Sequence, residues 1–177
     1  MSVSLCGCAS RQGQLGDAPR DNGHIAHRMS SREIGLLLST DPVRAEAVLR
    51  SVIAAEPFNG PAHNNLGVAL LRQGRLYEAA NACEAARKLM PGNPDPRINL
   101  ALVLERAGRV DEAIDAFEAA LEVSPSYIPA AQGLTRLQIS SNRSDHRTAS
   151  MLREIALRGE TLEWREWARI QGSKFAR

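Results

Sequence analysis

The stretch "LGVALLRQGRLYEAA", from Leu66 to Ala80, is followed 34 residues later by "LALVLERAGRVDEAI", from Leu100 to Ile114. The two stretches share their spacing of leucines, a glycine and an alanine, so one pattern is written twice. A fixed period of this length indicates that one structural unit recurs along the chain. Further pairs at this spacing are Gly74 and Gly108, Ala79 and Ala113, Pro57 and Pro91, and Pro91 and Pro125.

Each unit is predicted to form two helices joined by a tight turn. Leucines four residues apart, such as Leu66 and Leu70, lie on one face of a helix. Gly74 and Gly108 fall between the two helices, where a left-handed backbone costs little only for glycine. The recurring prolines end the second helix, because proline cannot continue it. Small residues are expected where the helices cross, since bulk there would hold the backbones apart. The expected packing positions are Leu66, Gly67, Ala79, Leu100, Ala101 and Ala113.

This pattern resembles the tetratricopeptide repeat (TPR) family, whose repeats are 34-residue pairs of antiparallel helices. The family's usual tryptophan position holds His63 and Arg97 here, and its usual tyrosine position holds Leu70 and Leu104. The resemblance implies an all-α fold, a right-handed TPR superhelix (α-solenoid) of about three helix pairs plus a C-terminal capping helix.

The period divides the chain into segments. A degenerate repeat is expected over 30–59, where Asp41 would cap and Pro42 would open the second helix. After the full repeats, Ser144 or Asp145 would cap a helix that Gly159 ends, and Thr161 would cap a last helix over 162–170. The expected segments are 1–29 (disordered tether), 30–59 (degenerate TPR), 60–93 and 94–127 (TPRs), 128–170 (a third helix pair and the capping helix) and 171–177 (tail).

The TPR resemblance also implies a concave face lined by the first helix of each repeat. Asn65 and Asn99 occupy equivalent positions there and resemble the asparagine ladder of the O-linked N-acetylglucosamine transferase superhelix, whose amides hold a peptide backbone. Alternatively, these asparagines satisfy only local backbone. Arg72 and Arg106 favour an acidic ligand or are simply solvated. The expected partner-binding residues are Asn64, Asn65, Val68, Arg72, Asn99, Leu102, Arg106 and Arg136, with Leu71, Ile98, Glu105 and Gln132 in the same register.

Composition narrows the class of function. The chain is 44% hydrophobic and 24% charged, as in globular proteins, and its net charge of +2 is too small to indicate nucleic-acid binding. The histidines are scattered, and no phosphate-binding or metalloprotease motif occurs. We therefore expect no catalytic residues, no cofactor and no metal. Cys83 replaces an aromatic residue of the repeat and is expected to be a small buried side chain.

The C-terminal "TLEWREWARIQGSKF" contains both tryptophans of the chain, Trp164 and Trp167. Three residues apart, they share one face of a helix. One interpretation is that they attach the last helix to the preceding repeat. The other is that they form an exposed aromatic anchor for a partner.

At the N-terminus, Leu5-Cys6-Gly7-Cys8 resembles a bacterial lipobox, in which Cys8 would be lipidated. A signal peptide also needs a basic start and a longer apolar stretch. Either the start is assigned too far downstream or the match is accidental. The polar tract after Cys8 fits a flexible tether. We expect attachment to the bacterial cell envelope, with a cytoplasmic protein as the alternative.

The sequence thus predicts a non-enzymatic TPR scaffold that binds a peptide or protein partner, with membrane contact only through a lipid anchor. With such an anchor it would resemble small TPR lipoproteins that aid assembly of a pilus or secretion apparatus. The alternative is a soluble TPR module that self-associates through an uncapped end.

Overall fold

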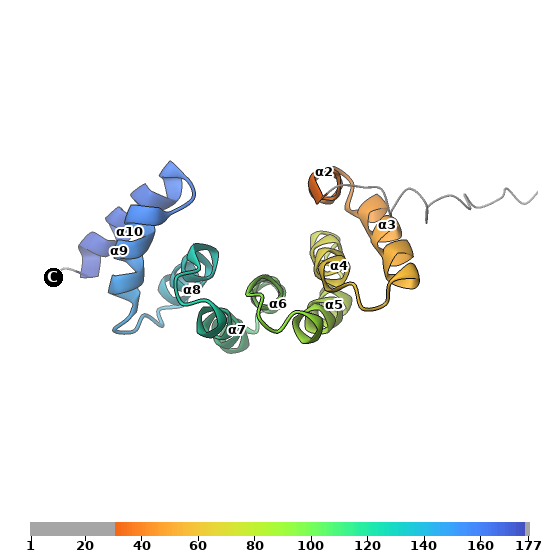
Figure 1. Ribbon diagram of the computed structural model, residues 1–177. Helices are drawn as coiled ribbons and strands as arrows, with labels where there is room; N and C mark the ends of the chain where they lie inside the picture. The colour runs from red at the N-terminus through yellow and green to blue at the C-terminus, as the bar shows by residue number, and fades with distance from the viewer. Residues whose placement is uncertain (1–30, 176–177) are drawn as a thin grey trace, which may run out of the picture.

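The computed structural model describes residues 31–175, with side chains from residue 34 onward. Over this range the elements are helices joined by short turns, and they follow one another along an arc (Figure 1). Helices α4, α6 and α8 lie along the inner side of the arc, and α5 and α7 along its outer side. The elements are α2 (Ser31–Thr40), α3 (Pro42–Ala55), α4 (Gly60–Arg72), α5 (Leu76–Leu89), α6 (Asp95–Arg106), α7 (Val110–Val123), α8 (Ile128–Ser140), α9 (Thr148–Arg158) and α10 (Leu162–Phe175).

The turns form where the sequence predicts them. Gly74 and Gly108 have φ angles of 76° and 75°, in the left-handed region that favours glycine. Asp41 caps α3, because its side chain accepts a hydrogen bond of 3.0 Å from the backbone N–H of Arg44, and Pro42 is the first residue of that helix. The second helix of each full repeat ends two residues before its proline.

The helices of a pair cross at residues with little side chain. Ala79, Ala101 and Ala113 are fully buried. A Cβ atom on Gly67 would lie 2.4 Å from the Sγ atom of Cys83 and 3.3 Å from the backbone oxygen of Ala79, so α4 approaches the backbone of α5 directly. Of the other expected packing positions, Leu66 is buried, and Leu100 is half-buried between two apolar clusters.

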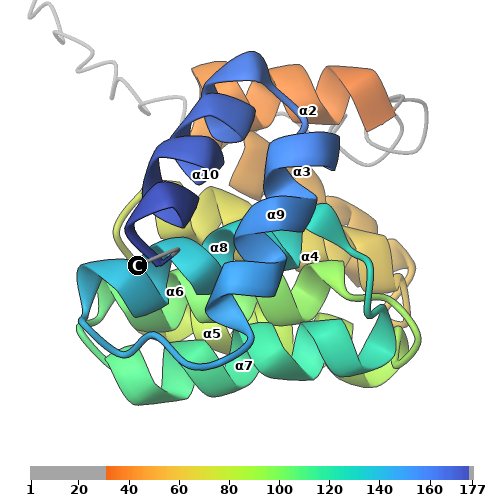
Figure 2. The same ribbon diagram turned by 90° about the vertical axis from the view of Figure 1, so that its left-hand side faces the viewer.

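The C-terminal end differs from the regular repeat. Helix α9 packs against both α8 and α10, and Figure 2 shows α9 running steeply across the direction of α7. Asp145, two residues before the N-cap Arg147 of α9, accepts hydrogen bonds from the backbone N–H groups of Arg147 and Thr148. Helix α9 ends at Arg158, directly before Gly159.

The last helix is longer than the predicted 162–170. Helix α10 begins after Thr161, whose Oγ1 atom accepts a hydrogen bond of 3.3 Å from the N–H of Trp164, and it continues to Phe175. Gly172 lies inside this helix, where an added Cβ atom would be 3.9 Å from the Cβ atom of Leu152 on α9, an ordinary van der Waals contact. Residues 171–175, predicted as tail, are therefore helical.

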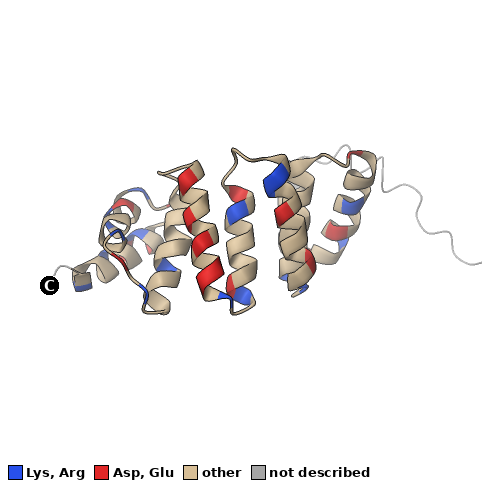
Figure 3. Ribbon diagram, turned by 90° about the horizontal axis from the view of Figure 1, so that it is seen from below, with Lys and Arg blue, Asp and Glu red and all other residues tan. Residues whose placement is uncertain are grey.

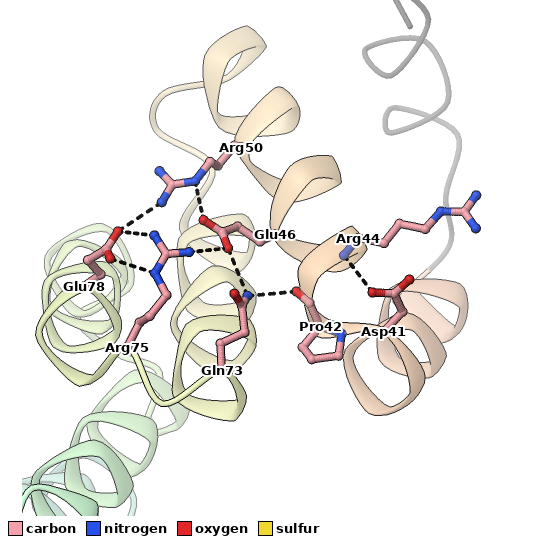
Figure 4. Close-up of polar contacts among 8 residues, drawn as sticks. All are labelled: Asp41, Pro42, Arg44, Glu46, Arg50, Gln73, Arg75 and Glu78. Atoms are coloured by element: carbon pink, nitrogen blue, oxygen red, sulfur yellow. Dashed lines mark hydrogen bonds and ion pairs between the residues drawn. The ribbon is translucent and has the colours of Figure 1, made fainter. Parts of the chain in front are cut away.

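A polar cluster joins the degenerate first pair to the first full repeat (Figure 4). The carboxylate of Glu46, on α3, accepts hydrogen bonds from Arg50 (2.8 Å), Gln73 (2.9 Å) and Arg75 (2.6 Å). Arg75 also donates to Glu78 of α5. Burial alone would raise the pKa of Glu46, but these three donors together lower it. Every charge in the cluster has an opposite partner, so its role is structural.

The crossing of α4 and α5 generates a stability prediction. Gly67→Leu should lower the free energy of unfolding by about 1–3 kcal/mol or more, because the new side chain must displace Cys83 and the backbone of α5. Asn65→Ala, two residues earlier on a half-exposed face, should cost far less. Thermal unfolding followed by circular dichroism compares the two variants, and equal melting temperatures would contradict this packing.

The polar cluster generates a pH prediction. Because folding lowers the pKa of Glu46, its contribution to stability is complete above the unfolded pKa of about 4.3 and is lost as the pH falls through the lower folded value. Glu46→Gln should therefore cost about 1 kcal/mol at pH 7 and progressively less in acid. Urea unfolding at several pH values measures this.

Glu84→Gln is the matched control for that experiment, since Glu84 pairs only with Arg87 within α5. It should cost less at pH 7 because it joins no second helix. A Glu46→Gln penalty that stayed constant with pH, or one no larger than the control's, would count against the linkage.

Candidate functional site

Helices α4 and α6, which lie along the inner side of the arc, carry half-buried apolar residues in the predicted partner-binding register. Val68 and Leu71 on α4 pack against the first core, and Ile98 and Leu102 on α6 pack against the second. Each of the four keeps part of its surface exposed. They form the floor of what we call the inner wall, the surface made by the predicted partner-binding positions of α4, α6 and α8.

Amides stand beside this floor. The Nδ2 atom of Asn99 donates a hydrogen bond of 2.9 Å to Oδ1 of Asn64, which joins α6 to α4. Asn65 makes no hydrogen bond through its side chain to any part of the chain that the structure describes, and it is half-exposed. The two asparagines of the predicted ladder are therefore not equivalent: Asn65 has its whole amide available, whereas Asn99 has used one of its two N–H groups.

The arginines of the inner wall also divide into two kinds. Arg136 on α8 forms two hydrogen bonds, of 2.8 and 2.7 Å, with the carboxylate of Glu105 on α6. These bonds raise the pKa of Arg136 and neutralise its charge. Arg72 and Arg106, the last residues of α4 and α6, are exposed and have no ion pair within residues 34–175.

Not every predicted position reaches the surface. The side chain of Gln132 on α8 is only 4% exposed, and its Nε2 atom has no hydrogen-bond partner among the described residues. A ligand lying on the inner wall therefore cannot contact this residue as it contacts the equivalent Asn64. Gln132 was predicted on the inner wall from its position in the repeat. That position does not reveal how closely the neighbouring helices cover the side chain.

A second feature adjoins the inner wall where α10 meets α8. Arg136, Glu163, Trp164 and Trp167 line a cavity of about 340 Å³, which we call the tryptophan socket. The two indole rings are 5.3 Å apart at an interplanar angle of 83°. Both tryptophans also pack against the apolar cluster that contains Ala168. They thus serve the attachment of the last helix and still line an open space.

Sequence reasoning paired the two tryptophans but missed Glu163 and the contribution of Arg136 to this socket. The signal for Glu163 was present in "LEWREW", since residues 163, 164 and 167 share one side of a helix. Residues of α10 and α8 line one socket because α9, which packs against both helices, is oriented steeply across the repeats. No local sequence pattern predicts that orientation.

The described residues contain neither an exposed cysteine nor a cluster of potential metal ligands. Cys83 is 0% exposed, and burial raises the pKa of its thiol to about 12, so it is not a nucleophile at neutral pH. No three His, Cys, Asp or Glu side chains within the described range are close enough to share a metal ion. No helix in this range has the length and apolar character needed to cross a membrane.

The outer side of the arc carries acidic side chains along α7 (Figure 3). Some of them are paired: Asp111 contacts Arg143, Glu112 contacts Arg109, and Glu118 contacts Arg147. The acidic residues of α7 are Asp111, Glu112, Asp115, Glu118 and Glu122. The predicted lipidation site, Cys8, lies outside the described residues.

Two family models match the chain, and both are described as tetratricopeptide repeat. One matches residues 39–94 and the other residues 70–134, so together they cover more than half of the chain. No curated protein matches it by sequence.

Solved structures show the same fold. MamA (41-end) from Desulfovibrio magneticus RS-1 has a TM-score of 0.62 at 18% identity, over 76% of this chain and 74% of that one. Another MamA crystal structure has a TM-score of 0.59 at 21% identity, over 70% of this chain and 67% of that one. An O-GlcNAc transferase mutant from Thermobaculum terrenum has a TM-score of 0.58 at 29% identity, over 70% of this chain but only 26% of the transferase.

Proposed function

We propose that this chain, which belongs to the tetratricopeptide repeat family, is a binding scaffold that holds an extended segment of a partner protein along its inner wall. The observation that carries the proposal is the presence of amide groups with free hydrogen-bonding capacity beside half-buried apolar residues on α4 and α6. Such a surface contacts the backbone and the side chains of a peptide at once. Its role is binding rather than catalysis.

The amides supply the backbone contacts. Asn65 can donate and accept, and Asn99 retains its carbonyl oxygen and one N–H group after bonding to Asn64. Each hydrogen bond to a peptide contributes only about 0.5–1.5 kcal/mol net. Burial of ligand side chains on Val68, Ile98 and Leu102 must therefore supply much of the affinity.

The free arginines favour an acidic partner segment. Arg72 and Arg106 lie at equivalent positions of consecutive repeats and have no carboxylate of their own within the described residues. Arg136 cannot serve in this way without breaking its two bonds to Glu105. We expect carboxylates of the ligand to face Arg72 and Arg106, with affinity that falls as salt is added.

Peptide selection tests this proposal. Twelve-residue peptides selected on the full chain should bind Asn65→Ala about threefold to tenfold more weakly than wild type. They should bind an Arg72→Ala, Arg106→Ala double variant more weakly still at low salt.

Arg44→Ala is the matched control, since Arg44 is an exposed arginine on the outer helix α3 and should have no effect. Calorimetry measures each affinity. Peptides that bound all variants equally would refute the inner wall as the site.

Anchoring at the cell envelope is a separate proposal. It is supported by the "LCGC" stretch that ends at Cys8 and by the polar tract that follows, which is long enough to separate a folded domain from a bilayer. A protein attached in this way would be suited to assembling an envelope structure such as a pilus or secretion apparatus.

Metabolic labelling tests the anchor. When the gene is expressed in a bacterial host with its native upstream region, the protein should incorporate labelled palmitate. Cys8→Ala should abolish the label, whereas Cys6→Ala, two residues away, should retain it. An unlabelled wild-type protein, or label that persists in Cys8→Ala, would exclude this anchor.

The self-associating module is less well supported. Apolar side chains are exposed at both ends of the arc, with Leu36 and Val43 at one end and Phe175 at the other. However, Arg153 and Arg169 line the groove that contains Phe175, and Arg44 follows Val43 directly. Stacking one end on the other would bring like charges together, which opposes association.

A further inference from the structure

The tryptophan socket has two aromatic walls that meet nearly at a right angle. Trp164 and Trp167 come from the first turns of α10, with ring centroids 5.3 Å apart and planes at 83°. Arg136 of α8 also lines the socket. Because Arg136 and its partner Glu105 belong to the inner wall, the socket opens beside the surface on which the partner segment is proposed to lie.

The charged residues around the socket leave one negative charge without a partner among the described residues. Both terminal nitrogens of the Arg136 guanidinium donate hydrogen bonds to the carboxylate of Glu105. The positive charge of Arg136 is therefore balanced by the negative charge of Glu105. Glu163 also lines the socket and has no ion pair within residues 34–175. The nearest arginine along α10, Arg165, donates instead to the backbone oxygen of Gly159. One uncompensated carboxylate therefore stands beside two indole rings.

This combination selects for a cation. The face of an aromatic ring attracts positive charge, and tryptophan does so most strongly. The apolar stem of a lysine or arginine can lie along the rings while its charged group reaches a carboxylate at the rim. An acidic side chain would be repelled by Glu163, and a purely apolar one would gain nothing from it.

We infer that the tryptophan socket binds the cationic side chain of a lysine or arginine in the partner segment. The inference rests on the proposed function and deepens it, since it adds a fixed basic residue to a segment whose carboxylates face Arg72 and Arg106. The site recognises the side chain itself, so a short peptide is enough to occupy it.

Intrinsic fluorescence provides a direct test, because Trp164 and Trp167 are the only tryptophans in the chain. The full chain is titrated with acetyl-Gly-X-Gly-amide, in which X is lysine, arginine, norleucine or glutamate. The lysine and arginine peptides should change the emission saturably. Norleucine, which has a similar stem without the charge, should bind at least about fivefold more weakly, and glutamate should produce no saturable change.

A matched pair of variants isolates the carboxylate. Glu163→Gln should weaken binding of the lysine peptide at least about fivefold and leave norleucine unchanged. Glu166→Gln, an exposed position on the same helix that does not line the socket, should leave both unchanged. Circular dichroism verifies that both variants fold. Equal binding of lysine and norleucine, no effect of Glu163→Gln, or no response to the lysine peptide would each overturn the inference.

The outcome is separable from that of the proposed function. Selected peptides that depend on Asn65 while the lysine tripeptide fails to bind would leave the inner wall in place and remove the socket. Binding of the tripeptide without any dependence of longer ligands on Asn65 would support the socket and reject the wall as the peptide site.

Discussion

Paired helices in this protein approach each other through residues that have almost no side chain. Gly67 faces Cys83 and the backbone of α5, and the alanines at equivalent crossings are fully buried. The same closeness recurs between repeats, where Gly133 of α8 leaves room for the ring of Phe117. This close contact sets the spacing of the helices and hence the curvature of the arc. The inner wall exists because the crossings leave no space for bulk.

Polar contacts between repeats fix the arrangement that packing begins. Glu46 holds the first pair on α4 and α5, Asn99 bonds to Asn64, and Glu105 bonds to Arg136. The last two lie on the inner wall, so residues that a ligand could use are partly committed to holding neighbouring helices in place. Under the proposed function, recognition falls to the residues without such bonds, chiefly Asn65 and the free arginines. One surface thus divides its side chains between rigidity and binding.

The regular part of the fold could be predicted from sequence because its determinants are local. Gly74 and Gly108 adopt the left-handed turns, and Asp41 caps α3, as their positions indicate. The full length of α10 was not predicted: the expected end was residue 170, whereas the helix continues to Phe175 and packs against α9. The burial of Gln132 and the placement of Glu163 beside Arg136 depend on tertiary packing at the turned C-terminal hairpin. Periodicity predicted the positions of the inner wall but not the tryptophan socket.

The steep orientation of α9 and α10 gives the trough a direction. At the α8 end of the inner wall, two aromatic rings and a carboxylate line the tryptophan socket. A chain threaded in reverse would present its basic residue to α2 and its acids to Glu163. If a partner segment binds as proposed, its direction therefore follows from the orientation of α9 and α10.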